Sequence, residues 1–141
     1  MKHFAQYADY QIDAYTALNT AFAQEGSFIQ VADNSQIETP IVLHYIYDSS
    51  AGAAMAFPRN LVLLGRNSEV KIIEKFEVLG EQSIWSNVVT EIALEQDARA
   101  QFYKVQDDNA HTYHLNHTQV HQTKGSTFTC LLYTSPSPRD A

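Results

Sequence analysis

The chain has 141 residues, 45% of them hydrophobic and 18% charged, so it has the size and composition of one folded domain and is too apolar to be disordered. Its net charge of -7 and its lack of a lysine and arginine cluster exclude non-specific nucleic-acid binding. The start has no signal-peptide pattern, and no uncharged apolar run approaches the ~20 residues that span a bilayer. The only cysteine of the sequence, Cys130, cannot form an internal disulfide. We therefore expect a cytoplasmic protein with no membrane or nucleic-acid partner.

A short amphipathic helix is predicted over about residues 9–24. Four apolar residues recur there at spacings of three and four, which places them on one side of a helix. They are Ile12, Tyr15, Leu18 and Phe22. Gly26 follows where a left-handed C-terminal cap would lie. We expect the apolar side of this helix to pack on the first strands.

After the helix the chain reads as one strand after another, and no second helix interrupts the series. The expected strands are 27–31, 41–47, 61–64, 70–78, 84–94, 98–105 and 111–121. The run 84–94 alternates between an apolar and a mixed face, which predicts a half-buried strand. The small, polar segment 48–54 is expected to be a surface loop.

A turn-forming residue followed by a small residue recurs four times before these strands. The pairs are Asn34-Ser35, Asn67-Ser68, Asp97-Ala98 and Gly125-Ser126, at intervals of 33, 30 and 28 residues. Periods of this length are typical of stacked repeats, and they predict the coils of a β-solenoid. An antiparallel sandwich is the alternative, but the chain has neither of the usual hairpin turns, Asn-Gly or Asp-Gly.

A histidine cluster near the C-terminus is the one candidate for a metal site. In an extended strand His111, His117 and His121 share a face, while His114 points the other way. The alternative, which we favour, is a solvated strand rich in histidine, so we expect no bound metal.

Two charged residues fall on apolar strand faces. Glu74 is in phase with Val70 and Ile72, and Lys104 is in phase with Ala100 and Phe102. We interpret Glu74 as the position of a bend, because a buried acid is costly. The sequence has no glycine-rich phosphate loop, no Gly-x-Ser-x-Gly motif and no paired Cys and His nucleophile. We expect no catalytic and no cofactor-binding residue.

The composition changes at residues 130–141. The string CLLYTSPSPRD, which starts at Cys130, resembles the conceptual translation of a transposase-type sequencing adapter. We expect residues 130–141 to be such an artefact and disordered, in which case Cys130 does not belong to the biological protein. A natural tail rich in serine and proline is the alternative.

Six short motifs, in order, resemble the SufB/SufD family. They are Thr-Ala-Leu-Asn-Thr-Ala-Phe at 16–22, Glu-Gly-Ser-Phe-Ile at 25–29, Pro-Arg-Asn-Leu at 58–61, Asn-Ser-Glu-Val at 67–70, Asn-Val-Val-Thr-Glu at 87–91 and Tyr-Lys-Val-Gln at 103–106. The resemblance covers about residues 7–129, and the first motif favours the SufD branch over SufB.

The resemblance implies a right-handed parallel β-helix preceded by one short helix, here a partial domain over residues 1–129. It further implies a non-enzymatic scaffold subunit that assembles iron-sulfur clusters in the cytoplasm with a SufB-like paralogue and a SufC-like ATPase. The family's cluster-assembly and SufC-docking segments lie toward the C-terminus of the full protein, so none is carried over and this fragment is expected to bind no cofactor. From another class, a β-helical carbohydrate-active enzyme or carbohydrate-binding protein is the alternative.

Overall fold

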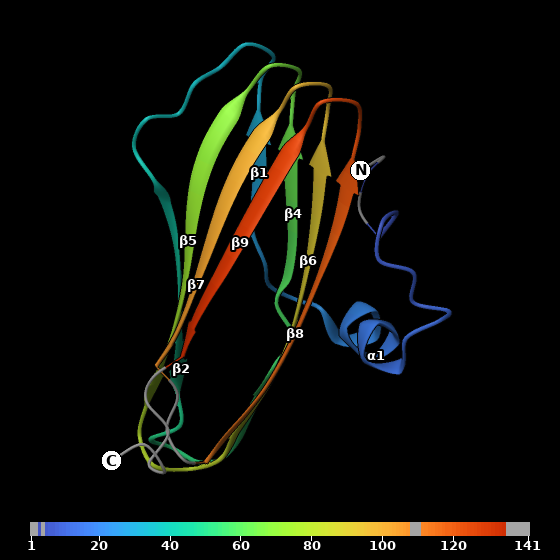
Figure 1. Cartoon of the computed structure of the whole chain (residues 1–141). Coiled ribbons are helices and arrows are strands. Elements are labelled where there is room, and N and C mark those ends of the chain that lie inside the picture. The colour runs from blue at the N-terminus through green and yellow to red at the C-terminus, as the bar shows by residue number, and fades with distance from the viewer. Residues whose placement is uncertain (1–2, 4, 108–110, 135–141) are drawn as a thin grey trace.

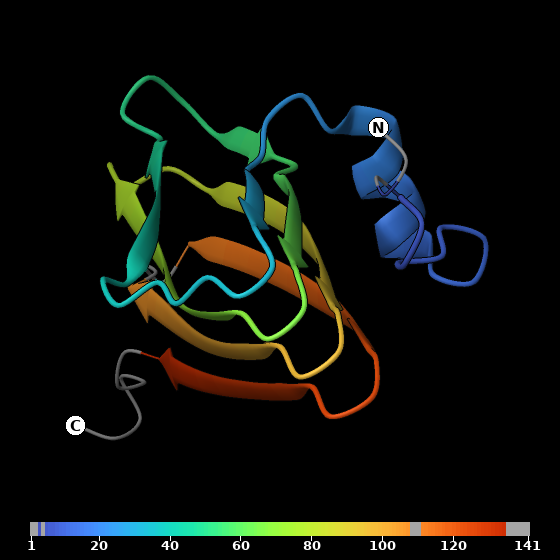
Figure 2. The same ribbon diagram turned by 90° about the horizontal axis from the view of Figure 1, so that it is seen from above.

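The chain winds into a parallel β-solenoid with one helix on its outside. The computed structural model describes residues 3, 5–107 and 111–134 (Figure 1). Each coil rises through one sheet, turns at the top, descends through a second sheet and returns at the bottom, and the winding is right-handed (Figures 1 and 2). This confirms the predicted fold class. The elements are α1 (Ala14–Phe22), β1 (Phe28–Val31), β2 (Ile41–Asp48), β3 (Ala54–Ala56), β4 (Arg59–Leu64), β5 (Glu69–Leu79), β6 (Ile84–Leu94), β7 (Arg99–Asp107), β8 (Thr112–Gln122) and β9 (Thr127–Thr134).

Two parallel sheets face each other across the interior. The first has the order β1-β4-β6, with β8 next to β6 and with β3 paired to the start of β6; the second has the order β2-β5-β7-β9. In the first sheet Phe28 pairs with Leu61, Arg59 with Val89 and Ile84 with Thr112. These offsets are 33, 30 and 28 residues, the same as the sequence intervals, so the predicted coil length is confirmed.

The upper corner of each coil explains the repeated motif. Asn34, Asn67 and Asp97 adopt positive φ angles of 61°, 52° and 59°, and Gly125 has a φ of 74°. Asn, Asp and Gly tolerate this left-handed conformation better than other residues. The small residue that follows turns inward, as Ser68 does with no exposed surface. The corner therefore needs a turn-former and then a small side chain.

The interior holds two apolar clusters, one toward the upper corners and one toward the bottom. The upper cluster contains Val31, Val62, Leu64, Val70, Ile72, Ile92, Leu94, Ala98, Ala100 and Phe102. The lower cluster contains Tyr47, Phe76, Ile84 and Val88. Polar side chains lie between the two clusters and are described below.

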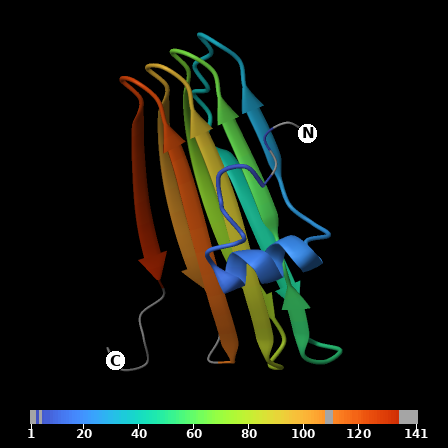
Figure 3. The ribbon, with the colours of Figure 1, turned by 90° about the vertical axis from the view of Figure 1, so that its right-hand side faces the viewer.

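Strand β6 is buried on both faces, so the prediction of a half-buried strand was wrong. Its inward residues pack in the core, as expected, but Val89 and Glu91 on the outer face are also fully buried. The cause is the N-terminal segment and α1, which lie across the outer face of the first sheet (Figure 3). Strand β6 has paired strands on both sides and is covered on its outer face, so it is the most enclosed of the described strands.

Helix α1 is shorter than predicted, and its polar side faces the sheet, whereas the prediction placed the apolar side there. Its buried residues are Thr16 and Asn19, whereas Ile12 just before it and Phe22 at its end are 84% and 56% exposed. The reason is the polar surface beneath it: the Asn19 amide donates to the carbonyl oxygens of Pro58 at 3.0 Å and of Asn87 at 2.7 Å. Hydrogen bonds, not the apolar side, fix the helix.

Gly26 is not a helix cap, because α1 ends at Phe22 and Ala23 leaves it in an extended conformation. A Cβ atom on Gly26 would lie 1.8 Å from the carbonyl oxygen of Arg59. Glycine is required here by the close approach of two backbones.

The expected disorder from Cys130 onward is wrong for residues 130–134. They continue β9, and Cys130 pairs with Phe102 of β7. An exposed sheet edge accepts a further strand through backbone hydrogen bonds, whatever its side chains. Residues 135–141 lie outside the described residues, and the adapter origin stays a prediction.

In the described part of the chain, no helix has both the length and the apolar surface needed to span a lipid bilayer.

Candidate functional site

A buried ion pair lies at the centre of the solenoid. Glu74 of β5 and Lys104 of β7 pair in register, and both point inward. Lys104 Nζ lies 3.2 Å from Glu74 Oε2, and the two residues are 6% and 0% exposed. Strand β5 runs unbroken through Glu74, so the predicted bend was wrong. The acid is tolerated in the interior because a cation from the next coil meets it.

Burial raises the pKa of Glu74, and the neighbouring Lys104 ammonium partly opposes that rise. Desolvation disfavours the carboxylate, while the opposite charge favours it. Burying these two charges costs free energy, and each charge is tolerated in the interior only because its partner is present.

Hydrogen bonds extend this pair toward the N-terminal coil. The Asn60 amide donates to Thr90 Oγ1 at 3.1 Å and to Glu74 Oε1 at 3.4 Å. Asn60 Oδ1 in turn accepts from the Tyr45 hydroxyl at 2.7 Å. Burial raises the pKa of Tyr45, so it stays a hydrogen-bond donor.

The same chain of contacts reaches the last coil. Lys104 Nζ donates to Thr118 Oγ1 at 2.7 Å and to Asn116 Oδ1. We call the whole set the axial network. Its members are Tyr45, Asn60, Glu74, Thr90, Lys104, Asn116 and Thr118. They connect successive coils and separate the two apolar clusters.

A second buried ion pair fastens the N-terminal segment to the outside of the first sheet. Arg59 Nη2 lies 3.0 Å from Glu91 Oε2, and neither side chain is more than 1% exposed. Glu91 also accepts hydrogen bonds from the backbone amides of Ala5 at 2.9 Å and of Tyr7 and Ala8 at 2.8 Å. We call Arg59, Glu91 and these amides the outer clamp.

His117 and His121 share the outer face of β8, as predicted, and His114 points to the other face. His111 precedes β8, while His117 and His121 face outward beside Val89 and Ala93. His117 Nδ1 lies 3.8 Å from a carboxylate oxygen of Asp13. Among residues 3, 5–107 and 111–134, no three His, Cys, Asp or Glu side chains gather as a metal ligand set would.

His114 points into the interior, as its phase in the strand predicts. Its ring packs edge-on against Phe76, with 4.4 Å between the centroids. Burial lowers the pKa of His114 to about 4, and the nearby Lys104 ammonium acts in the same direction. The imidazole is therefore neutral at neutral pH.

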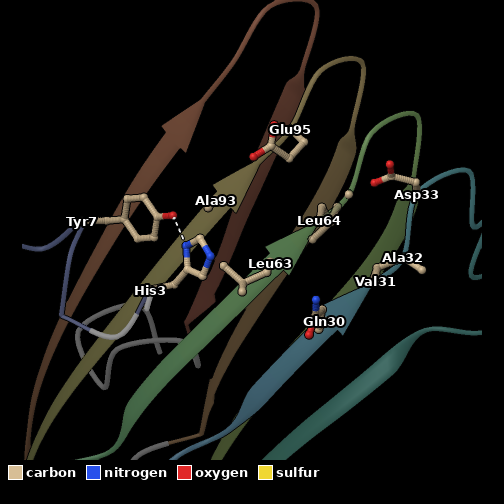
Figure 4. A pocket seen from close by; sticks show the side chains of 11 residues that line it. His3, Tyr7, Gln30, Val31, Ala32, Asp33, Leu63, Leu64, Ala93 and Glu95 are labelled. Carbon is tan, nitrogen blue, oxygen red and sulfur yellow. Dashed lines mark hydrogen bonds between the residues drawn. The ribbon is translucent and has the colours of Figure 1, made fainter. Parts of the chain in front are cut away.

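A polar pocket of about 320 Å³ lies between the N-terminal segment and the upper ends of β1, β4 and β6 (Figure 4). His3 Nδ1 is 2.8 Å from the Tyr7 hydroxyl, and both face Glu95 across the pocket. The other carboxylate, Asp33, already pairs with Arg66 at 3.2 Å. Of the two carboxylates among the described lining residues, Asp33 is therefore engaged in an ion pair outside acid-base chemistry.

Sequence reasoning missed Arg59, Asn60 and Asn19. The available signal was the pair Arg59-Asn60, two polar residues that directly precede the apolar run Leu61–Leu64. Polar residues at the start of a buried strand indicate a buried polar contact, but not its partner.

These features define a parallel β-solenoid in which the strongly buried charges connect one part of the chain to another. Comparison with known proteins then identifies the family. Residues 45–136 match the model described as "SUF system FeS cluster assembly, SufBD core domain", and residues 1–43 match the "SufBD protein N-terminal region". The chain belongs to the SufBD family.

Curated relatives match over most of the chain. An iron-sulfur cluster assembly SufBD family protein of Synechocystis is 25% identical over an alignment of 124 residues that covers 82% of this chain and 27% of that protein. The chloroplastic protein ABCI7 of Arabidopsis thaliana is 25% identical over an alignment of 122 residues that covers 82% of this chain and 26% of that protein. A SufBD family protein of Staphylococcus aureus is 29% identical over an alignment of 116 residues that covers 81% of this chain and 24% of that protein. The chain thus spans about a quarter of the length of these relatives, and no solved structure matches it significantly.

Proposed function

We propose that the chain is part of a scaffold subunit for iron-sulfur cluster assembly, of the SufD type, which works in the cytoplasm with a SufB-like paralogue and a SufC-like ATPase. The observation that carries the proposal is the succession of the two family matches along a single solenoid. The cluster is cargo of the assembled complex, and in the part of the chain that the structure describes no three His, Cys, Asp or Glu side chains gather as its ligands would.

The positions of the charged residues support a role without catalysis. Glu74 is neutralised by Lys104 inside the solenoid, and Glu91 is saturated by Arg59 and three backbone amides. A carbohydrate-active β-helix would instead present two carboxylates to a sugar on an open face. The two buried acids here are both committed to contacts within the chain.

The SufD assignment rests on the motif at residues 16–22. In the structure this motif lies within α1, where Thr16 and Asn19 are buried and Asn19 donates to the carbonyl oxygens of Pro58 and Asn87.

Co-expression tests the proposal. The full-length protein, tagged, is purified together with a SufC-like ATPase and a SufB-like paralogue, and we expect all three to elute as one complex. The control uses the paralogue and the ATPase without the tagged protein. Failure to recruit the ATPase, or ATP hydrolysis or sugar release by the purified protein alone, would count against a non-enzymatic SufD role.

A further inference from the structure

An apolar groove lies between α1 and the lower end of the first sheet. Its walls are Leu18, Phe22, Met55, Phe57 and Trp85, and its volume is about 500 Å³. Phe22 is 56% exposed and Met55 is 72% exposed. No polar side chain lines it.

The groove is an ordered surface, because its aromatic side chains contact one another. The rings of Phe22 and Phe57 stack at 5.4 Å, and Phe57 meets Trp85 edge-on at 5.3 Å. In the sheet, Met55 pairs in register with Trp85, and Trp85 pairs with Tyr113, which is 67% exposed. This row crosses three strands below α1, and the helix lies across the same strands (Figure 3).

The exposed side of α1 forms the other wall. Leu18 and Phe22 belong to the apolar stripe that the sequence shows and that the sheet does not use. A continuous exposed surface of this kind marks an interaction site in soluble proteins. Trp, Tyr, Phe and Met are also the residue types enriched at protein interfaces.

The chain segments that build the groove carry acidic charges, and the nearest cation in sequence, Arg59, is buried in its pair with Glu91. The segments that build the walls and rim of the groove, 9–28, 48–58 and 80–87, contain no lysine and no arginine. They contain five acids: Asp9, Asp13, Glu25, Asp48 and Glu81. Glu25 lines a cavity next to the groove together with Phe22, Met55 and Phe57.

We propose that this groove binds a basic amphipathic helix of a protein partner. An apolar groove suits the apolar stripe of a helix, whose anchoring side chains recur at spacings of three and four residues. An acidic rim attracts lysine and arginine on the flanks of such a helix and speeds its association. The same rim repels a second copy of the chain, whose groove is equally acidic, and it repels an anionic membrane surface. The inference does not depend on the role in cluster assembly.

The test is a binding titration with a defined probe. A fluorescein-labelled idealised helical peptide of leucine and lysine is added to the purified chain, and fluorescence anisotropy gives the Kd. We expect saturable binding that weakens about tenfold in Met55→Lys and about fivefold in Glu25→Lys, and that weakens by a similar fivefold for the unaltered chain at roughly 1 M salt, where the charges are screened but the apolar contacts remain. Met55 is the main position to vary, because at 72% exposure its replacement does not threaten folding.

The matched control lies on the outer face of the second sheet. Val42 and Ile46 are 57% and 54% exposed, so Val42→Ser with Ile46→Ser removes a similar apolar surface away from the groove. This variant should bind the peptide as the unaltered chain does.

Three results would overturn the proposal. The first is that Met55→Lys binds the leucine and lysine peptide with the same Kd as the unaltered chain. An equal Kd of the unaltered chain for a peptide of leucine and glutamate would count in the same way. The second is self-association that Met55→Lys abolishes, which would make a second copy the occupant. The third is groove-dependent binding to phosphatidylglycerol vesicles, which would make it a membrane contact.

Discussion

The ammonium of Lys104 lies 3.2 Å from the carboxylate of Glu74 in the solenoid interior. In Lys104→Met we expect the free energy of unfolding to fall by about 3 to 5 kcal/mol, because the carboxylate stays buried without its partner. The double variant Glu74→Gln with Lys104→Met should recover most of this loss. Urea unfolding of the four proteins measures the cycle.

The control pair for this cycle is Lys75 and Glu77, whose nitrogen and oxygen are 2.9 Å apart but 39% and 34% exposed. Lys75→Met should cost less than about 1 kcal/mol, because an ion pair in water contributes little. If Lys104→Met is as mild as Lys75→Met, the buried pair does not have the importance that we assign to it.

His114 predicts a dependence of stability on acid pH. Its folded pKa of about 4 lies below the ordinary value of about 6.5, so the unfolded chain takes up the proton first. The stability that neutral His114 contributes is complete above about pH 6.5 and is lost as the pH falls toward 4, by roughly 3 kcal/mol in total.

Phe76 and Lys104 are among the groups that face His114, and Glu74 lies beyond the lysine. The raised pKa of Glu74 acts in the opposite sense in acid, so the prediction concerns the difference between the unaltered chain and His114→Gln. Urea midpoints from pH 7 to 4 should converge as the pH falls. Parallel curves would show that the imidazole does not titrate as we infer.

At the scale of elements, two glycines with similar backbone conformations differ in the space that a Cβ atom would have. Gly26 and Gly52 have similar φ angles of 157° and 149°, but a Cβ on Gly26 would lie 1.8 Å from the Arg59 carbonyl oxygen, and one on Gly52 would meet nothing within 4 Å. Gly26→Ala should therefore destabilise the chain by about 2 kcal/mol more than Gly52→Ala does, because β1 must move away from β4.

Thermal melting followed by circular dichroism compares the two glycine variants. Equal melting temperatures would mean that the backbone near Gly26 adjusts without cost.

Helix α1 shows which structural features a local sequence pattern can predict and which it cannot. Its existence was predictable, because the spacing of apolar residues is a local property. The side that faces the sheet was not, because it depends on carbonyl oxygens of Pro58 and Asn87 far along the chain. The axial network was also beyond reach: the sequence marked Glu74 and Lys104 as unusual, but only coil stacking puts them together.

At the scale of the whole molecule, the last described coil of the solenoid has an unpaired edge. Strands β8 and β9 have a pairing neighbour on one side only among the described strands. Leu131, Leu132 and Tyr133 of β9 are 43%, 59% and 55% exposed. An exposed strand edge with apolar side chains favours pairing with another chain.

We therefore expect the 141-residue chain to self-associate in solution. Size-exclusion chromatography with light scattering should show species larger than a monomer, and Leu131→Lys with Tyr133→Lys should shift the distribution toward monomer. Met55→Lys, in the groove, should leave it unchanged. A monomer that melts cooperatively would contradict the prediction.

Most of the strands, the coil length of about 30 residues and the corner positions could be predicted from the sequence, because strand alternation, positive φ and a small inward side chain are properties of a few neighbouring residues. The sequence did not show the short strand β3 or the strand β9, nor which charges are paired, which side of α1 is buried and why β6 is covered on both faces. Those outcomes depend on surfaces that stacking brings together from residues 30 or more positions apart, and no local pattern contains that information.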